Sequence, residues 1–364
     1  MKKMLCMILA VLLLLSLCSC TLEDLLHIPS PKDYNLIGDA KLVVHFIDVG
    51  QGDSTLLESD GEFVLIDAGE TEYGDRVVDY IESRGCSKLK YIIATHPDSD
   101  HIGGLKTVIE SVDAENFITS ETNKSTSTWL NVLKAVDDYD LNYIDAKAGE
   151  TYSFGEASFT VLAPLGESYE NYNNYSVVVK AVCGDISFLL TGDAETESED
   201  QMLSAGEDLS ADVLKCGHHG SSTSTSDDFL TAVHPAFAII SCGKDNDYGH
   251  PHRETVSKLN NRGIAYYRTD TAGTIVAATD GRELSILSHG GTQTEAETIS
   301  KEDLTNSTSS SDSIFPYVGN KSSKVYHRYT CSGVKTMNEQ NKIYFETKEQ
   351  AQQKGYSPCS QCQP

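Results

Sequence analysis

A regular alternation of short apolar runs with helix-like segments, from residue 41 to residue 288, most constrains the fold of this chain. The runs Leu42–Asp48, Ser54–Glu58 and Phe63–Asp67 are joined by glycine-containing turns, which is the pattern of β-strands. Between later runs, segments such as Arg76–Arg84 repeat their apolar residues with the period of a helix. This order predicts an α/β fold of two sheets covered by helices, an αβ/βα sandwich.

The remaining predicted elements complete the two sheets and their helical cover. Helices are expected at Ile102–Val112, Trp129–Val136, Glu195–Ala205 and Glu254–Asn261. Strands are expected at Tyr91–Thr95, Ser158–Leu162, Tyr175–Cys183, Ile186–Thr191, Val213–Cys216, Phe237–Ser241, Ala265–Arg268, Gly273–Ala278 and Leu284–Leu287. We therefore predict one continuous domain over residues 41–288.

The composition restricts the functions that such a domain can have. Of the 364 residues, 39% are hydrophobic, which is enough apolar material for a core and excludes wholesale disorder. The chain carries 54 acidic against 28 basic residues, a formal net charge of −26, so its overall field repels polyanions. Any chemistry on phosphate groups must therefore rest on a local positive feature such as bound metal.

The N-terminus has the pattern of a targeting segment. Two lysines precede the apolar run Met4–Leu17, which is too short for a transmembrane helix and has the length of a signal-peptide core. The following Leu17-Cys18-Ser19-Cys20 resembles a bacterial lipobox, so we predict a signal peptide over 1–19, lipidation of Cys20 and a tether over 20–40. These predictions place the protein outside the cytoplasm, anchored to the membrane. A plain secretory signal with incidental cysteines is the alternative.

Imidazole and carboxylate side chains follow several of the predicted strands. Four of them, His96, Asp98, Asp100 and His101, lie within six residues directly after the strand at 91–95. Three more, Asp67, Asp193 and His218, follow other strands beside glycine. Strand ends meet at one edge of a sheet, and these residue types bind divalent metal ions. The first group alone is equally compatible with a solvated loop, but the ordered set predicts a metal site.

The same motifs resemble a known family. The segments Phe46–Ser54, Thr95–Gly104, His218–Ser221 and Tyr248–Pro251 resemble the metallo-β-lactamase fold, and in finer detail the hydrolase domain of the ComEC DNA-uptake proteins. The resemblance covers about residues 40–288. It does not extend to the membrane helices that form the channel of the ComEC proteins. It implies a free-standing, lipid-anchored relative of that domain.

The resemblance implies roles for individual residues. His96 and Asp98 would be ligands of a first metal ion, and Asp100, His101 and His218 would be ligands of a second. Asp193 would be the carboxylate that bridges both ions, and Asp67 would orient a ligand imidazole. Two positions depart from the family, because Asp98 stands where His is usual and the nearest candidate for a further His is Asn174, a poor zinc ligand. We expect two divalent ions, zinc or manganese, because carboxylate ligands suit the harder manganese ion.

The predicted chemistry is hydrolysis by water that two metal ions activate. Asp100, His219 and His250 are the predicted catalytic residues. Ser221 and Ser222, which follow His219, either contact phosphate or cap a helix, in which case His219 is structural. The glycine-rich turn with Asp48, Asp53 and Ser54 either lines the cleft or serves only the turn.

The C-terminal part of the chain differs in composition. Residues 289–314 are rich in Ser and Thr and predict a linker, whereas residues 315–364 contain seven Lys or Arg against three Glu. Their motifs His327-x3-Cys331 and Cys359-x2-Cys362 predict a closed zinc site that stabilises a small module. Two disulfides are the alternative, but three cysteines is an odd number. The block resembles the zinc-binding domain of Ada-type DNA-repair proteins, which implies nucleic acid as partner; a purely structural module is the alternative.

Three functions remain open from the sequence. The first is an extracytoplasmic metal-dependent phosphodiesterase or nuclease that acts on DNA and is linked to DNA uptake, competence or degradation. The second is a hydrolase of small esters, lactones or β-lactams on the same fold, since a fold alone does not fix a substrate. The third is a non-catalytic surface lipoprotein that binds DNA. The ligand set favours an enzyme and the basic tail favours DNA, while no protein partner can be inferred.

Overall fold

The computed structural model describes residues 39–288 and 297–301, and, in the C-terminal part, 304, 317–328, 331–335, 337, 341–345, 347–360 and 362. The predicted signal peptide, Cys20 and nearly all of the predicted tether and linker lie outside the described residues. Among the residues that are described, no helix is long and apolar enough to span a bilayer.

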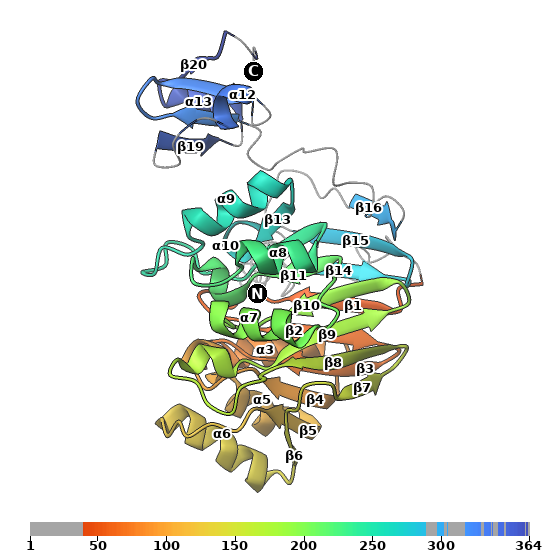
Figure 1. The fold of residues 1–364 in the computed structure, drawn as a ribbon. Coiled ribbons are helices and arrows are strands. Elements are labelled where there is room, and N and C mark those ends of the chain that lie inside the picture. Colours follow the sequence, from red (N-terminus) through yellow and green to blue (C-terminus); the bar gives the residue numbers. More distant parts are fainter. Residues whose placement is uncertain are drawn as a thin grey trace, which may run out of the picture.

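Two mixed sheets form the main domain (Figure 1). The nine-stranded sheet has the order β16-β15-β14-β1-β2-β3-β4-β5-β6, and the seven-stranded sheet has the order β13-β12-β11-β10-β9-β8-β7. The strands of the first sheet are β1 Leu42–Phe46, β2 Thr55–Ser59, β3 Glu62–Ile66, β4 Lys88–Ala94, β5 Asp113–Thr119, β6 Asn142–Asp145, β14 Ile275–Thr279, β15 Glu283–Ser288 and β16 Glu297–Ser300. Those of the second are β7 Thr151–Phe154, β8 Ala157–Ala163, β9 Val178–Cys183, β10 Ile186–Leu190, β11 Val213–Lys215, β12 Phe237–Ile240 and β13 Ala265–Arg268.

Helices cover the outer face of each sheet (Figure 1). The first sheet is covered by α3 Gly74–Ser83, α4 Ser99–Ile102, α5 Leu105–Ser111 and α6 Ser127–Asp138, and the second by α7 Thr196–Ala205, α8 Asp227–Val233 and α9 Arg253–Arg262. Side chains from the inner faces of both sheets, such as Phe46, Phe159 and Phe188, form the central core. The predicted αβ/βα sandwich is therefore confirmed.

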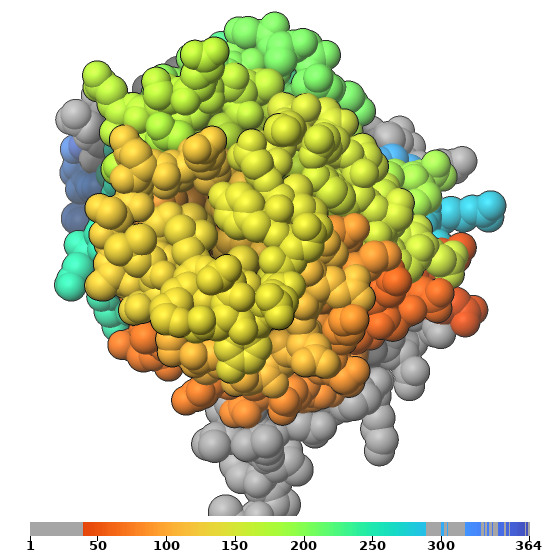
Figure 2. All heavy atoms as spheres, turned by 90° about the horizontal axis from the view of Figure 1, so that it is seen from below, coloured from red at the N-terminus to blue at the C-terminus, as the bar shows by residue number. Residues whose placement is uncertain are grey.

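Both sheets contribute to the end of the molecule that Figure 2 shows from below. The hydroxyl of Tyr172, in the short 3-10 helix η2 Tyr172–Tyr175 before β9, donates a hydrogen bond of 2.6 Å to Asn123, before α6. The other short elements are η1 Thr71–Tyr73, η3 Gly217–Gly220 and α10 Thr269–Ala272. Loops of the two halves thus meet at the junction of the sheets.

Some elements differ from those predicted. The predicted helix 102–112 is interrupted at Gly103 and Gly104, which lie between α4 and α5. Both positions require glycine, because a Cβ there would lie 2.4 Å from the backbone of Thr71 or Ala68. Strands β5, β6 and β7 and helix α8 were not predicted. Strand β16 pairs with β15, and Leu304 is buried in the central core, although both fall within the predicted linker.

The C-terminal module has a sheet of its own (Figure 1). Its strands, in the order β19-β17-β18-β20, are β17 Tyr317–Asn320, β18 Val325–Arg328, β19 Lys342–Phe345 and β20 Ser357–Pro358, with helices α12 Ser332–Lys335 and α13 Lys348–Gln353. The guanidinium of Arg253, at the start of α9, donates a hydrogen bond of 2.6 Å to the carbonyl of Lys342. The module thus contacts the main domain at the helix that follows the predicted His250 loop.

Candidate metal centre

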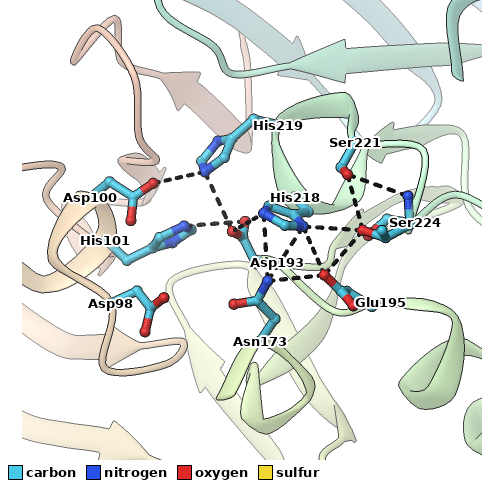
Figure 3. Close-up of polar contacts among 12 residues, drawn as sticks. Asp98, Asp100, His101, Asn173, Asp193, Glu195, His218, His219, Ser221 and Ser224 are labelled. Atoms are coloured by element: carbon cyan, nitrogen blue, oxygen red, sulfur yellow. Dashed lines mark hydrogen bonds and ion pairs between the residues drawn. The ribbon is translucent and has the colours of Figure 1, made fainter. Parts of the chain in front are cut away.

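Parallel strands of both sheets end at the site. β3 and β4 are parallel neighbours in the first sheet, and β10, β11 and β12 are parallel neighbours in the second. Ligands in such sheets gather at the carboxyl ends of the strands, where the connecting loops lie. Asp67 follows β3, His96 follows β4, Asp193 follows β10, and the pair His218 and His219 follows β11. Figure 3 shows side chains from these loops pointing toward one another.

His101 is held by Asp67 at the back of the site. The Asp67 carboxylate accepts hydrogen bonds from His101 Nδ1 at 2.7 Å, the Thr95 hydroxyl at 2.6 Å and the Thr95 amide at 2.9 Å. His101 Nδ1 therefore carries a hydrogen, and Nε2 faces Asp193 Oδ1 at 3.1 Å. A carboxylate behind an imidazole in this way orients the ring as a metal ligand.

His96 is also fully buried and presents its Nε2. The Thr95 hydroxyl donates to Asp67 and can accept a hydrogen from His96 Nδ1, 3.1 Å away, while the Ser176 hydroxyl lies 3.4 Å from the same nitrogen. Burial, together with the positive charge favoured on His101, lowers the pKa of His96 to about 4. The ring is neutral near pH 7 and its Nε2 lone pair is available to a cation.

His219 lies across the site from His101 (Figure 3). Its Nδ1 donates to the carbonyl of Ser241 at 3.0 Å, and its Nε2 lies 3.2 Å from Asp100 and 3.4 Å from Asp193. His218 and His219 both have left-handed backbone, with φ of 50° and 53°, which costs about 1–3 kcal/mol for each such residue. This conformation sends the two successive imidazoles in different directions.

His218 points outward and pairs with Glu195, which was not predicted as a site residue. Its Nδ1 lies 3.0 Å from Glu195 Oε1, and its Nε2 lies 3.7 Å from Asp193 Oδ2. Asn173 also donates to Glu195, at 3.1 Å. Asn174, which the sequence offered as a poor metal ligand, is turned toward α7. Its side-chain oxygen accepts a hydrogen bond from the amide of Glu195, and its side-chain nitrogen donates one to Glu197. The structure thus places His219 deeper in the site than His218, and Asn173 nearer to the site than Asn174.

The outer wall of the site contains Asp98, Asp100 and His250. A polar cleft opens over the buried residues and is lined by Gln51, Asp98, Asp100, Asn173, Asp193, His218, His219, Tyr248 and His250. Asp98 is paired with Lys124 and lies 4.0 Å from His96 Nε2. The His250 ring lies 5.3 Å from that of His218, and burial lowers its pKa to about 4. Ser226, rather than Ser221 or Ser222, caps helix α8.

The donor atoms of this cluster fit a divalent cation. Within the described residues, His96 Nε2, His101 Nε2, Asp53 Oδ1 and Asp193 Oδ1 are buried without a hydrogen-bond partner. Asp53, His101, Asp193 and His219 each offer a ligand atom, and these atoms lie within 4.8 Å of one another. Because buried polar atoms in proteins are nearly always satisfied, four such atoms in one place indicate a missing partner with positive charge.

The titration of these groups indicates the same charge. Burial alone would lower the pKa of His101 and His219, but the nearby carboxylates, Asp193 foremost, outweigh it and raise both pKa values. The same imidazoles hold the pKa of Asp193 well below its usual range against the effect of burial, and that of Asp100 at about 2. The cluster therefore favours positive charge at its centre, which a bound divalent cation supplies.

Asp53 and Lys215 complete the floor of the site. The sequence left open whether Asp53 lines the cleft or serves only its turn, and Lys215 was not predicted as a functional residue. Lys215, at the end of β11 and almost fully buried, donates to the carbonyls of Gly192 and Cys216 at 3.1 Å each and pairs with the carboxylate of Asp53. The amide of Asp53 donates to the carbonyl of Asp100 at 3.1 Å. The pair thus joins the loops of the first sheet to those of the second, directly below the cluster.

The C-terminal module brings its four predicted ligands together. Ligand atoms of His327, Cys331, Cys359 and Cys362 lie within 4.8 Å of one another. His327 Nδ1 lies 3.4 Å from Cys331 Sγ, and the amide of Arg328 donates to Cys362 Sγ at 3.3 Å. Three thiols and one imidazole in this arrangement suit a closed tetrahedral zinc site.

Known proteins and families are similar to parts of this chain. Residues 301–364 match the family model of the metal binding domain of Ada. ComE operon protein 3 of Bacillus subtilis is 33% identical over 250 residues, which are 64% of this chain and 32% of that protein. Recombination protein 2 of Haemophilus influenzae is 32% identical over 238 residues, 64% of this chain and 28% of that protein. The chain thus spans about a third of the length of these curated relatives.

The similar solved structures are more distant in sequence. CmlA β-hydroxylase, in its E377D mutant, has a TM-score of 0.46 and 13% identity and covers 69% of this chain and 55% of its own. Rm3 metallo-beta-lactamase has a TM-score of 0.35 and 17% identity, covering 47% of this chain and 76% of its own. Residues 47–244, more than half of the chain, match the family model of the metallo-beta-lactamase superfamily, and the chain belongs to that superfamily.

Proposed function

We propose that this protein is a metal-dependent phosphodiesterase that acts on DNA outside the cytoplasm. The observation that carries the proposal is the group of buried imidazole and carboxylate atoms without hydrogen-bond partners at the base of a polar cleft. Divalent ions bound there would activate water and offset the negative charge of a phosphodiester. The net charge of −26 makes such a local positive centre necessary for any anionic substrate.

The proposed ligands divide between the two sheets. His96, Asp98, Asp100 and His101 come from the first sheet, and Asp193, His218 and His219 come from the second. Asp67 orients His101, the carbonyl of Ser241 orients His219, and Glu195 orients His218. His219, which the sequence suggested as a catalytic group, serves in this proposal as a ligand, because it lies between Asp100 and Asp193. His250 stays a proposed catalytic residue in the cleft wall.

DNA as substrate rests on the relatives and on the tail. Two of the relatives are named ComE operon protein 3 and Competence protein ComA, so a link with competence is part of the proposal. The C-terminal module, with seven Lys or Arg against three Glu, is the basic part of an acidic protein and is proposed to contact nucleic acid. The cleft is lined mainly by carboxylates, imidazoles and amides, which suits a charged substrate better than an apolar ester.

The test compares substrates side by side. Full-length protein, reconstituted with manganese or zinc, is incubated with bis(p-nitrophenyl) phosphate, single-stranded DNA, double-stranded DNA and a chromogenic β-lactam. Hydrolysis of the phosphodiesters that depends on metal supports the proposal. Turnover of the β-lactam alone, or no turnover with any metal, contradicts it.

The two metal environments should respond differently to a chelator. The cleft offers imidazoles and carboxylates, whereas the tail offers three thiolates, which bind zinc more tightly and select it. A mild chelator is expected to remove metal from the cleft and stop hydrolysis while the tail keeps its zinc, and manganese should restore activity. Metal analysis of full-length protein and of a chain ending at Ser310, which keeps β16 and the buried Leu304, measures both sites. Equal zinc in the two proteins after chelation would show that the tail site does not exist.

The proposed location depends on Cys20, which precedes the described residues. Loss of the thiol removes the lipid attachment point, so Cys20→Ala is expected to leave the precursor unprocessed or to release the protein from membranes. Cell fractionation and the mass of the N-terminal peptide measure the outcome, with Cys18→Ala as the matched control. Wild-type protein without lipid in the soluble fraction would contradict the anchor.

A further inference from the structure

The loop between β12 and α9 is fixed at the mouth of the cleft. Asn246 donates to the carbonyls of Gly243 and His250 at 2.8 and 2.7 Å, and its side-chain oxygen accepts from the amide of His250 at 2.9 Å. Gly243 is tied to the first sheet by a bond of 3.1 Å from its amide to Gln51. The loop is thus closed on itself and attached at its base.

The tip of the loop, at Tyr248, is held by His252. His252 Nδ1 accepts from the amide of Ser222 at 2.9 Å, so the ring hydrogen is on Nε2, which donates to the carbonyl of Tyr248 at 3.2 Å. A histidine that accepts at one nitrogen and donates at the other has a fixed tautomer. The position of the Tyr248 backbone is therefore set by the same segment that carries His218 and His219.

The Tyr248 ring continues a series of rings that starts in the metal centre. The rings of His219 and His250 are 5.9 Å apart, and those of His250 and Tyr248 are 5.6 Å apart and nearly parallel, at 18°. Tyr248 is 67% exposed, the highest fraction among the exposed large hydrophobic residues of the described chain. One face of the ring is thus backed by His250, while most of the side chain is open to solvent beside the cleft.

The exposed aromatic ring of Tyr248 offers a flat face to a ligand in the cleft. Most of the other residues that line the cleft can contact a ligand through charge or hydrogen bonds, and the carboxylates among them repel the phosphates of a nucleic acid. Stacking of a base on an aromatic ring needs no charge and contributes to the binding of single-stranded nucleic acids of any sequence. Such a contact would place a nucleotide so that its phosphate lies over the metal centre.

We propose that Tyr248 is the stacking platform for one unpaired nucleobase, and that the preferred substrate is single-stranded nucleic acid. The proposal rests on the phosphodiesterase proposed above and names the part of the substrate that the cleft recognises beside the scissile phosphate. A base within a duplex has both faces covered by its neighbours, so stacking on Tyr248 requires a single strand or an unpaired end.

The test combines a change in the protein with a change in the ligand. Binding of a fluorescent phosphorothioate oligothymidylate, which resists hydrolysis, is measured by anisotropy with full-length, metal-loaded protein. The same strand is then used with one abasic residue at each position in turn. One abasic position is expected to weaken binding by wild-type protein about tenfold. Tyr248→Ala should weaken binding of the intact strand equally, and that abasic position should then cost nothing further.

Control variants separate stacking from other effects. Tyr248→Phe keeps the ring and should bind like wild type, and Tyr139→Ala removes a tyrosine that is 50% exposed but does not line the cleft. The tenfold effect should persist at raised salt, because stacking is not a charge interaction. Unchanged binding by Tyr248→Ala, or an equal loss for intact and abasic strands at every position, would overturn the proposal.

The experiments distinguish a failure of the proposed function from a failure of this inference. If wild-type protein does not hydrolyse bis(p-nitrophenyl) phosphate or DNA with any metal, while the coupling between Tyr248 and one base remains, the chain binds single strands without cleaving them. If hydrolysis is present and the coupling is absent, the phosphodiesterase stands and Tyr248 is not its platform.

Discussion

Asp193→Asn is expected to reduce phosphodiester hydrolysis about a thousandfold or more, the largest effect that we expect for a single residue of the site. Asp193 lies between the imidazoles of His101 and His219, at 3.1 and 3.4 Å, and its buried Oδ1 faces His101 Nε2 without the geometry of a hydrogen bond. An amide keeps the shape of the side chain but removes the charge that both proposed metal positions share. The loss should therefore appear in metal content as well as in kcat/KM.

The control for this measurement is another carboxylate in the loops that connect the strands of the second sheet. Asp208→Asn removes a carboxylate that is 76% exposed and paired only with Lys180 among the ion pairs of the described residues, so it should leave activity unchanged. Asp67→Asn is expected to fall between the two, with a loss of roughly 10–100-fold, since it disturbs the orientation of a ligand. Asp193→Asn with near-wild-type turnover and full metal content would contradict the metal mechanism.

Much of the fold could be predicted because apolar runs mark buried strands whatever their partners. The runs that precede or contain Asp67, His96 and Asp193 have this form. The structure brings these three residues together around His101, which pairs with both aspartates and whose ring lies 4.2 Å from that of His96. Strand β6, Asn142–Asp145, was missed because it is an edge strand without a fully buried residue. Helix α8 was missed because its seven residues are too few to show a helical period, although Ser226 and the two acidic residues after it are a helix-start signal. Strand β16 and the buried Leu304 were missed because they lie in a segment with the composition of a linker. Strand β16 pairs with β15, and Leu304 packs in the central core.

The details of the site depend on contacts that no periodicity shows. His218 and His219 are neighbours in the sequence, and only their left-handed backbone decides that His219 faces Asp193 while His218 faces Glu195. Asp53 is one acidic residue in a glycine-rich turn, and its partner is 162 positions away on another sheet. The single signal for Lys215 was a cation within an apolar strand, where a buried charge requires a buried partner.

Lys215→Met is expected to lower the free energy of unfolding of the main domain by about 3–5 kcal/mol, because it leaves the buried Asp53 carboxylate without its cation. The double variant Lys215→Met/Asp53→Leu removes both charges and should recover part of that loss. Urea unfolding followed by the fluorescence of Trp129, the one tryptophan of the chain, reports this domain and not the tail.

The matched control is the lysine of a surface pair. Lys180→Met breaks the pair with Asp208, in which the lysine side chain is 13% exposed and the carboxylate 76% exposed. It should cost only about 0–1 kcal/mol, because solvent around the carboxylate already screens the interaction and replaces the lost partner. If Lys215→Met costs no more than Lys180→Met, the Asp53–Lys215 pair does not hold the two halves of the site together. If the single variant is strongly destabilised and the double variant recovers, the pair joins the sheets below the metal centre and the ligands are positioned before metal binds.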